Sequence, residues 1–376
     1  MHTRKSRGLG LERALINVAV AAGLIACGGG GKATGSGGSP GSSGGAMSAA
    51  GSSAVSESGA SSGGTAPSSA GSGAAAGTVA SSGSAGNGSG ATGGRGEGSG
   101  GTAPITDGGA PCTVGAWPAA DPALAGPFAT VTENDVGPAA GVGEDGGAPV
   151  AFTMFRPKDL SQGGLCHPVI TWGNGTGSNP SLYKVLLNHF ASHGFVVIAS
   201  DSPNVGQGSP PPMVAGVTWV LQQNEDPTSE LYQKIDTTHI GATGHSQGGF
   251  ATTTAGADSH ITTIAPLCGA SSQRNLHGPA WLFCGGMDTT VPCTTVQNAF
   301  KAISNVPVMQ ASYLSADHAN WITFRGTKPG PVEVATTAWM RLQLMGDTSL
   351  RSWFYGPSCK LCTDAAWQIT QKMMDQ

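Results

Sequence analysis

Residues 244–249 (GHSQGG) hold a serine between two glycines, in a Gly-x-Ser-x-Gly pattern. They follow residues 238–243, which are typical of a short strand, and precede residues 250–255, which can begin a helix. A tight strand-to-helix turn lifts a serine hydroxyl above the edge of a sheet and requires residues without side-chain bulk around it. The pattern predicts that Ser246 is a nucleophile and that the Gln247 N–H donates to a developing oxyanion.

A serine nucleophile needs a general base, and His318 is the candidate. It follows a predicted strand at 308–314, and catalytic residues of parallel sheets gather at the carboxyl ends of strands. The side chain of His245 should point away from the serine hydroxyl. We expect His189 and His193 on the surface of a helix.

The acid that orients the histidine is predicted to be Asp288. It follows the predicted strand 280–284 through a short turn that contains two glycines. Asp201, which follows an earlier strand, is the alternative acid. With Asp288 the three residues occur in the chain order serine, aspartate, histidine, which is the order of α/β-hydrolases.

A second oxyanion donor is expected in the glycine-rich residues 173–177, directly after the predicted strand 168–172. Glycines there let backbone N–H groups approach a substrate, and we assign the N–H group of Asn174. The same residues would also suit a simple turn. A phosphate-binding loop is disfavoured because the lysine and the third glycine of the known phosphate and dinucleotide motifs are missing.

The elements that position these residues alternate between buried strands and helices. This alternation predicts an α/β fold with a mainly parallel central sheet and helices on both faces. The expected strands lie at 128–131, 150–155, 168–172, 195–199, 238–243, 261–267, 280–284 and 308–314, with a glycine-rich turn at 137–148. The first expected helix begins at Pro180, with Asn179 as its N-cap. Further helices are expected at 213–223, 250–255, 296–303 and 332–345.

The N-terminus is typical of a targeting segment. Four basic residues precede the apolar run 14–26, which is too short to span a bilayer comfortably. The run ends in Leu-Ile-Ala-Cys and resembles a bacterial lipobox, which predicts cleavage of residues 1–26 and lipidation of Cys27. An ordinary cleaved signal peptide is the alternative. We expect an extracytoplasmic lipoprotein on the outer membrane or cell surface, or otherwise a secreted protein.

Residues 27–110 are almost entirely small and polar after the cysteine. Such a segment cannot bury enough apolar surface to offset its ordering entropy, so we expect a disordered tether. A Gly/Ser-rich coil of this length has a reach of roughly 50 Å. Residues 111–376 contain the aromatic and large aliphatic residues and form the predicted catalytic domain.

Charge and cysteine content narrow the class of protein. The chain has a formal charge of −4, and removal of residues 1–26, with their four basic residues and one acid, makes it −7. This acidic balance excludes nucleic acid as an expected partner. The eight cysteines leave an odd number when Cys27 is set aside, so at least one has no partner in the chain. Candidate disulfides, which spacing alone does not settle, are Cys112–Cys166, Cys284–Cys293 and Cys359–Cys362. No metal site is expected, because the Cys-x-x-Cys motif lacks a second ligand pair.

Four landmarks together carry a family resemblance: residues 173–177, residues 191–198 (ASHGFVVI), residues 244–249, and Asp288 with His318. From about residue 126 to 355 the chain resembles α/β-hydrolases that include bacterial cutinases, poly(ethylene terephthalate) hydrolases and chlorophyllase-like esterases. The resemblance implies an α/β-hydrolase fold without a large lid, and ester hydrolysis. The mechanism through an acyl-enzyme needs no cofactor, and we expect a monomer. The substrate cleft is then expected to include Trp172, His245, Leu267 and Trp321.

The chain departs from the polyester-cleaving members of this family at three places. These members usually carry an aromatic residue where Asn174 stands, a methionine where Gln247 stands, and a tryptophan near Leu267. A lipase, or an esterase acting on plant polysaccharides, is therefore an alternative with the same three catalytic residues. A surface adhesion protein with a relic hydrolase fold is the alternative from another class, and the intact serine, aspartate and histidine argue against it.

Overall fold

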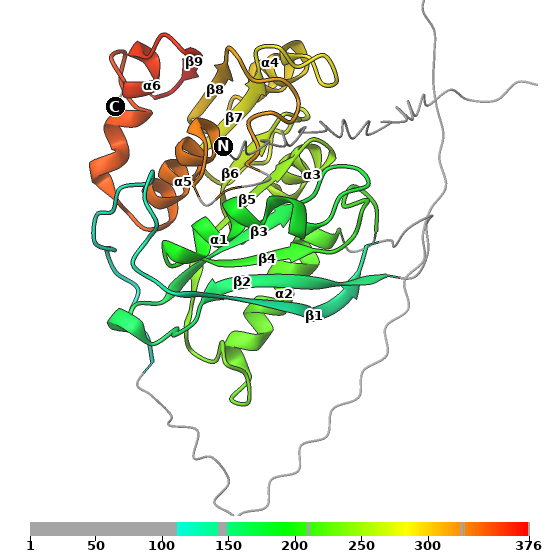
Figure 1. Ribbon diagram of the computed structural model, residues 1–376, viewed down its shortest axis with the longest axis vertical. Coiled ribbons are helices and arrows are strands. Elements are labelled where there is room, and N and C mark those ends of the chain that lie inside the picture. The colour runs from blue at the N-terminus through cyan, green and yellow to red at the C-terminus, as the bar shows by residue number, and fades with distance from the viewer. Residues whose placement is uncertain (1–110, 142–148, 209–210, 324–325, 327, 375–376) are drawn as a thin grey trace, which may run out of the picture. The chain divides into compact units, whose positions relative to one another are not determined.

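The computed structural model describes residues 111–141, 149–208, 211–323, 326 and 328–374. These residues form a nine-stranded sheet in the order β1-β2-β4-β3-β5-β6-β7-β8-β9, which Figure 1 shows from bottom to top. The strands are β1 (Thr130–Ala140), β2 (Val150–Pro157), β3 (His167–Gly173), β4 (Val196–Ser200), β5 (Ile235–His245), β6 (Ile261–Leu267), β7 (Ala280–Gly285), β8 (Val308–Tyr313) and β9 (Trp367–Lys372).

Helices lie on both faces of this sheet. The helices are η2 (Gln162–Gly164), η3 (Pro180–Tyr183), α1 (Lys184–Ser192), α2 (Pro212–Glu225), α3 (Gln247–Ala255), α4 (Cys293–Ala302), α5 (Pro331–Leu344), η4 (Thr348–Trp353) and α6 (Lys360–Thr363). One hydrophobic cluster joins the sheet to α1 and α5, and a second joins it to α2, α3 and α4. The sheet therefore buries both of its faces, as a parallel sheet must.

The strands from β4 to β8 in the sheet order pair in parallel, while β1, β2 and β9 are antiparallel additions at the two edges. The prediction of a mainly parallel sheet with helices on both faces is confirmed. Because the parallel strands run the same way, the carboxyl ends of β3, β5, β7 and β8 meet at one edge of the sheet. The loops that follow these strands carry the candidate catalytic residues.

The two edges differ from the prediction. The strand expected at 128–131 is β1, which begins at Thr130 and continues to Ala140, into the expected turn at 137–148. Its sequence lacks strand periodicity, and pairing with β2 across two register irregularities determines its extent. The edge strand β9 was not predicted, because its largely polar and partly exposed residues show no buried run. Residues 142–148 lie outside the described part of the chain.

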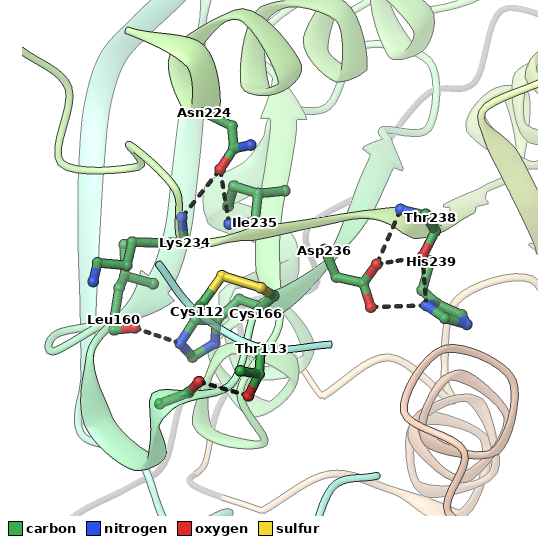
Figure 2. Close-up of a disulfide and its surroundings, with 12 residues drawn as sticks. Cys112, Thr113, Leu160, Cys166, Asn224, Lys234, Ile235, Asp236, Thr238 and His239 are labelled. Carbon is green, nitrogen blue, oxygen red and sulfur yellow. Dashed lines mark hydrogen bonds and ion pairs between the residues drawn. A yellow bond between two sulfur atoms is a disulfide. The ribbon is translucent and has the colours of Figure 1, made fainter. Parts of the chain in front are cut away.

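Three disulfides join all three candidate cysteine pairs, so these pairings are confirmed. Cys112–Cys166, seen in Figure 2, ties the first described residues to the start of β3. Cys284–Cys293 closes the loop that contains Asp288. Among the described cysteines, Cys268 has a free thiol, and it is buried.

The predicted signal peptide at 1–26, the lipidation site at Cys27 and the tether at 27–110 lie outside the described residues. Within the described ranges, no helix combines the length and the hydropathy needed to cross a membrane.

Candidate active site

Ser246 stands between the end of β5 and the first residue of α3, and its backbone is left-handed, with φ +57° and ψ −117°. This conformation is unfavourable for a residue with a side chain, so surrounding contacts must hold it. The Ser246 N–H donates to the carbonyl of Leu267, at the end of β6, over 2.9 Å. The predicted strand–turn–helix geometry around Ser246 is therefore present.

The glycines of this turn let α3 lie against the sheet. A Cβ atom added to Gly248 would lie 1.9 Å from the carbonyl oxygen of Gly173 in β3, and one added to Gly244 would lie 2.6 Å from the Gly248 oxygen. Neither position can hold a side chain unless the helix moves away from the strands. The close approach of helix and strands explains why glycine occurs on both sides of the serine.

Three side chains from separate loops meet at this edge of the sheet. His318 Nε2 lies 2.9 Å from Ser246 Oγ, and His318 Nδ1 lies 2.7 Å from Asp288 Oδ2. The other carboxylate oxygen of Asp288 accepts backbone N–H groups from Thr290, at 2.9 Å, and Val291, at 2.8 Å. The Asp288 side chain is fully buried, while 18% of the His318 side chain is exposed.

The environment of Asp288 keeps its carboxylate charged. Burial acts to raise its pKa, but hydrogen bonds from His318 and from the Val291 and Thr290 N–H groups outweigh burial and lower the pKa below its ordinary value. A charged carboxylate at Nδ1 fixes the proton on that nitrogen. Nε2 of His318 is then free to accept the Ser246 proton, which is the role of a general base.

A second aspartate–histidine pair lies at the opposite end of β5. Asp236 Oδ2 and His239 Nδ1 are 2.7 Å apart, and Thr238 donates to the other oxygen of Asp236 (Figure 2). Asp236 is the second residue of β5, whereas Ser246 follows the last residue of that strand. This pair offers a natural control for the Asp288–His318 pair.

The two predicted oxyanion donors follow β3 and β5. Gln247 is the first residue of α3, so its N–H has no acceptor within the helix, and its side chain donates to Asn204 at 2.6 Å. The Asn174 side chain is buried; it accepts from Trp172 Nε1 at 3.0 Å and donates to the Ser200 carbonyl at 2.6 Å. These contacts fix the loops, and oxyanion binding by the two N–H groups stays a prediction.

The predicted position in the substrate cleft is wrong for two of the four residues. Trp172 and Leu267 have no exposed surface and pack in a hydrophobic core cluster, so neither can contact a substrate. His245 and Trp321 are each 6% exposed. The His245 ring packs against His318, with ring centroids 4.8 Å apart, and against Trp321 at 5.4 Å, so it lies behind the histidine rather than in an open cleft.

Other candidates have structural roles. His189 and His193 are buried, which corrects their expected surface position, and they bond to backbone carbonyls of Pro122 and Leu124. The alternative acid Asp201 accepts from Thr153 at 2.7 Å, while Asp288 occupies the position beside His318.

Two residues beside the site were not predicted from the sequence. The Tyr183 hydroxyl lies 3.0 Å from His245 Nδ1, although the two residues are 62 positions apart and no short pattern links them. The thiol of Cys268 is buried near Asp288, and burial together with the Asp288 charge raises its pKa. The sequence does not show that either residue is near the site, because only the folded chain brings them to the loops after β5 and β7.

His245, Cys268 and His318 bring ligand atoms within 4.8 Å of one another, so their chemistry could suit a metal ion. The ring nitrogens of both histidines are, however, already engaged in hydrogen bonds. A metal ion would have to displace these bonds and deprotonate a thiol whose pKa is raised. The arrangement is suited to a hydrogen-bonded network.

A sequence model of the PETase family, described as PET hydrolase-like, matches residues 104–371. The chain belongs to the PET hydrolase-like family. This membership confirms the predicted resemblance and, with the nine-stranded sheet, the α/β-hydrolase fold class. It also supports the prediction that the chain is a carboxylic-ester hydrolase.

Curated proteins similar to part of this chain include chlorophyllase-1 of chloroplasts from Citrus unshiu and from Citrus sinensis. Each is 28% identical over 150 residues, which is 36% of this chain and 43% of the relative. The chain thus matches less than half of the length of these relatives.

We expect Gly248→Ala to destabilise the protein by about 3 kcal/mol, because the new methyl group would overlap the Gly173 carbonyl. It should also abolish labelling of Ser246 by a fluorophosphonate. Urea unfolding and gel-based labelling measure the two effects. Gly115→Ala is the control, since its added Cβ would meet Leu165 at an ordinary 3.5 Å. Normal stability and labelling of Gly248→Ala would contradict the packing argument.

Proposed function

We propose that the protein is a serine carboxylic-ester hydrolase in which Ser246 is the nucleophile, His318 the general base and Asp288 the acid. The observation that carries the proposal is the continuous hydrogen-bonded line from Ser246 Oγ through the His318 ring to the Asp288 carboxylate, with distances of 2.9 Å and 2.7 Å. Membership of the PET hydrolase-like family supports the same reaction.

In the proposed reaction His318 Nε2 takes the Ser246 proton while the serine oxygen attacks the ester carbonyl. The N–H groups of Gln247 and Asn174 stabilise the oxyanion of the tetrahedral intermediate. The charged Asp288 carboxylate stabilises the imidazolium form of His318. The alcohol then leaves with the proton from His318, and the acyl group stays on Ser246.

Water completes the cycle. His318, again neutral, takes a proton from a water molecule that attacks the acyl-enzyme, and the carboxylic acid leaves as Ser246 recovers its proton. The chemistry uses only side chains and backbone groups of this chain. We propose that the enzyme acts as a monomer.

We propose an apolar acyl group or a polyester surface as the substrate. Two large apolar side chains, Met287 and Leu314, are 64% and 47% exposed. Met287 lies two residues after β7 and precedes Asp288, and Leu314 directly follows β8 in the connection that leads to His318. Exposed apolar side chains at a site edge favour apolar ligands. A series of p-nitrophenyl esters of increasing chain length, acylglycerols, acylated polysaccharide and polyester film separates a polyester hydrolase from a lipase and from a polysaccharide esterase.

We propose that the enzyme is held outside the cytoplasm by acyl chains on Cys27, with residues 28–110 as a tether. The proposal is supported by the basic residues, the short apolar run and the Leu-Ile-Ala-Cys sequence at the N-terminus. Acyl chains would anchor the protein to a membrane surface without a spanning helix.

Ser246→Ala should keep the fold and lower kcat for short p-nitrophenyl esters by about 10⁴- to 10⁶-fold, because the nucleophile is gone. Asp288→Asn should lower kcat by about 10⁴-fold, because an amide no longer fixes the proton on His318 Nδ1 and the imidazolium loses its charged partner. Asp236→Asn is the matched control, since it alters the buried aspartate of the other aspartate–histidine pair described above, and it should retain wild-type kcat. Full activity of Ser246→Ala would refute the proposed mechanism.

Cys27→Ser should remove incorporation of an alkyne-labelled fatty acid and release the protein from the membrane fraction, because the thiol is the proposed acylation site. Ser42→Ala, in the tether, should leave labelling and fractionation unchanged. Fatty-acid labelling and membrane fractionation in a bacterial host measure both effects. A wild-type protein that enters the medium without a fatty acid would support a simple cleaved signal and contradict the anchor.

A further inference from the structure

A buried tyrosine next to the site takes no part in the proposed proton transfer. Tyr183, at the end of η3, is 2% exposed and packs against Trp172, with ring centroids 4.8 Å apart. Its hydroxyl lies 3.1 Å from the backbone nitrogen of Gly175 and 3.0 Å from His245 Nδ1. The side chain of Ser178 is a further hydrogen-bond partner of this hydroxyl. A buried hydroxyl has a single proton to donate, so it donates to one of these groups and accepts from the others.

The direction of each bond follows from the chemistry of the groups. His245 Nε2 lies 2.9 Å from the backbone carbonyl of His318, and a carbonyl only accepts, so Nε2 carries a proton. Burial, with the nearby His318, lowers the pKa of His245 to about 3, so its ring is neutral and Nδ1 is an acceptor. Tyr183 must then donate to Nδ1, and its oxygen accepts the Gly175 N–H.

The two ends of this chain of bonds belong to the two loops that the proposed reaction uses. Gly175 directly follows Asn174, the proposed oxyanion donor after β3. The carbonyl at the other end belongs to His318, the proposed base after β8. A Cβ atom on Gly175 would lie 3.0 Å from the Tyr183 hydroxyl and 3.5 Å from Ser246 Cβ, so the network packs directly against the nucleophile.

We propose that Tyr183 and His245 are positioning residues, which hold the oxyanion loop at Asn174 and the base loop at His318 in fixed relative positions around Ser246. This inference rests on the proposed function. It assigns the pair a role in the transition state rather than in substrate binding, because the oxyanion forms only after attack. Loss of the Tyr183 hydroxyl breaks the link between the two loops, since it removes the acceptor for the Gly175 N–H and the donor for His245 Nδ1.

The test is Tyr183→Phe, which removes one oxygen and keeps the ring against Trp172. We expect kcat for p-nitrophenyl esters to fall about 10- to 100-fold, as for a small misplacement of catalytic groups, while KM stays within about twofold. Titration with a fluorophosphonate counts competent sites, so that kcat refers to folded enzyme. Tyr355→Phe is the matched control, because its hydroxyl accepts from Gln343 at 3.3 Å in another part of the fold, and it should keep wild-type kcat.

A second pair of variants tests the other member. His245→Gln keeps an N–H donor able to face the His318 carbonyl, whereas His245→Leu removes it, so the glutamine variant should retain at least fivefold more kcat. These two variants also test the positioning role if Tyr183→Phe fails to fold. A purely structural role would lower the number of titratable sites in all variants without changing kcat per site.

Wild-type kcat per site in Tyr183→Phe, or equal kcat in His245→Gln and His245→Leu, would overturn the positioning role. Failure of the proposed function has a different signature. In that case Ser246→Ala would remain active and wild-type Ser246 would resist the fluorophosphonate, whatever the behaviour of the Tyr183 and His245 variants.

Discussion

The left-handed backbone of Ser246 depends on how closely α3 approaches the strands beneath it. The approach is possible because Gly248 and Gly173 meet backbone to backbone, with no room for a Cβ atom. This contact allows the sharp turn that raises the serine hydroxyl above the sheet edge. It also places Gln247 at the first position of α3, where its N–H has no acceptor within the helix. The other parts of the site are arranged around that fixed hydroxyl.

Each remaining loop is held by its own constraint. The Cys284–Cys293 disulfide closes the loop of Asp288, whose carboxylate also accepts two backbone N–H groups within that loop. The His318 loop bonds through its carbonyl to His245, and the Asn174 loop is held through its buried amide side chain. Loops fixed in this way need little reorganisation when charge develops in the transition state, which is the condition for electrostatic catalysis.

Much of the site could be predicted because position after a buried strand is a strong signal in parallel sheets. Ser246, Asp288 and His318 each follow such a strand, and the structure brings their side chains together. Their catalytic roles stay predictions. The sequence does not determine the direction of individual side chains: Trp172 lies at the carboxyl end of β3, one residue before its last, but its side chain is in the core. Tyr183 could not be found either, because its partner His245 is distant in sequence. The edge strand β9 was not predicted for a different reason: exposed edge strands lack the hydrophobic run that identifies central strands.

The central claim is that an acyl group passes through Ser246 Oγ. The most direct measurement is mass spectrometry of enzyme quenched in acid within milliseconds of mixing with a p-nitrophenyl ester. The account predicts one added acyl group on the peptide that contains Ser246, growing in at the rate of the p-nitrophenol burst and decaying with turnover. Hydrolysis at the normal rate without acylated Ser246 at any time, or with the acyl group on another residue, would contradict it.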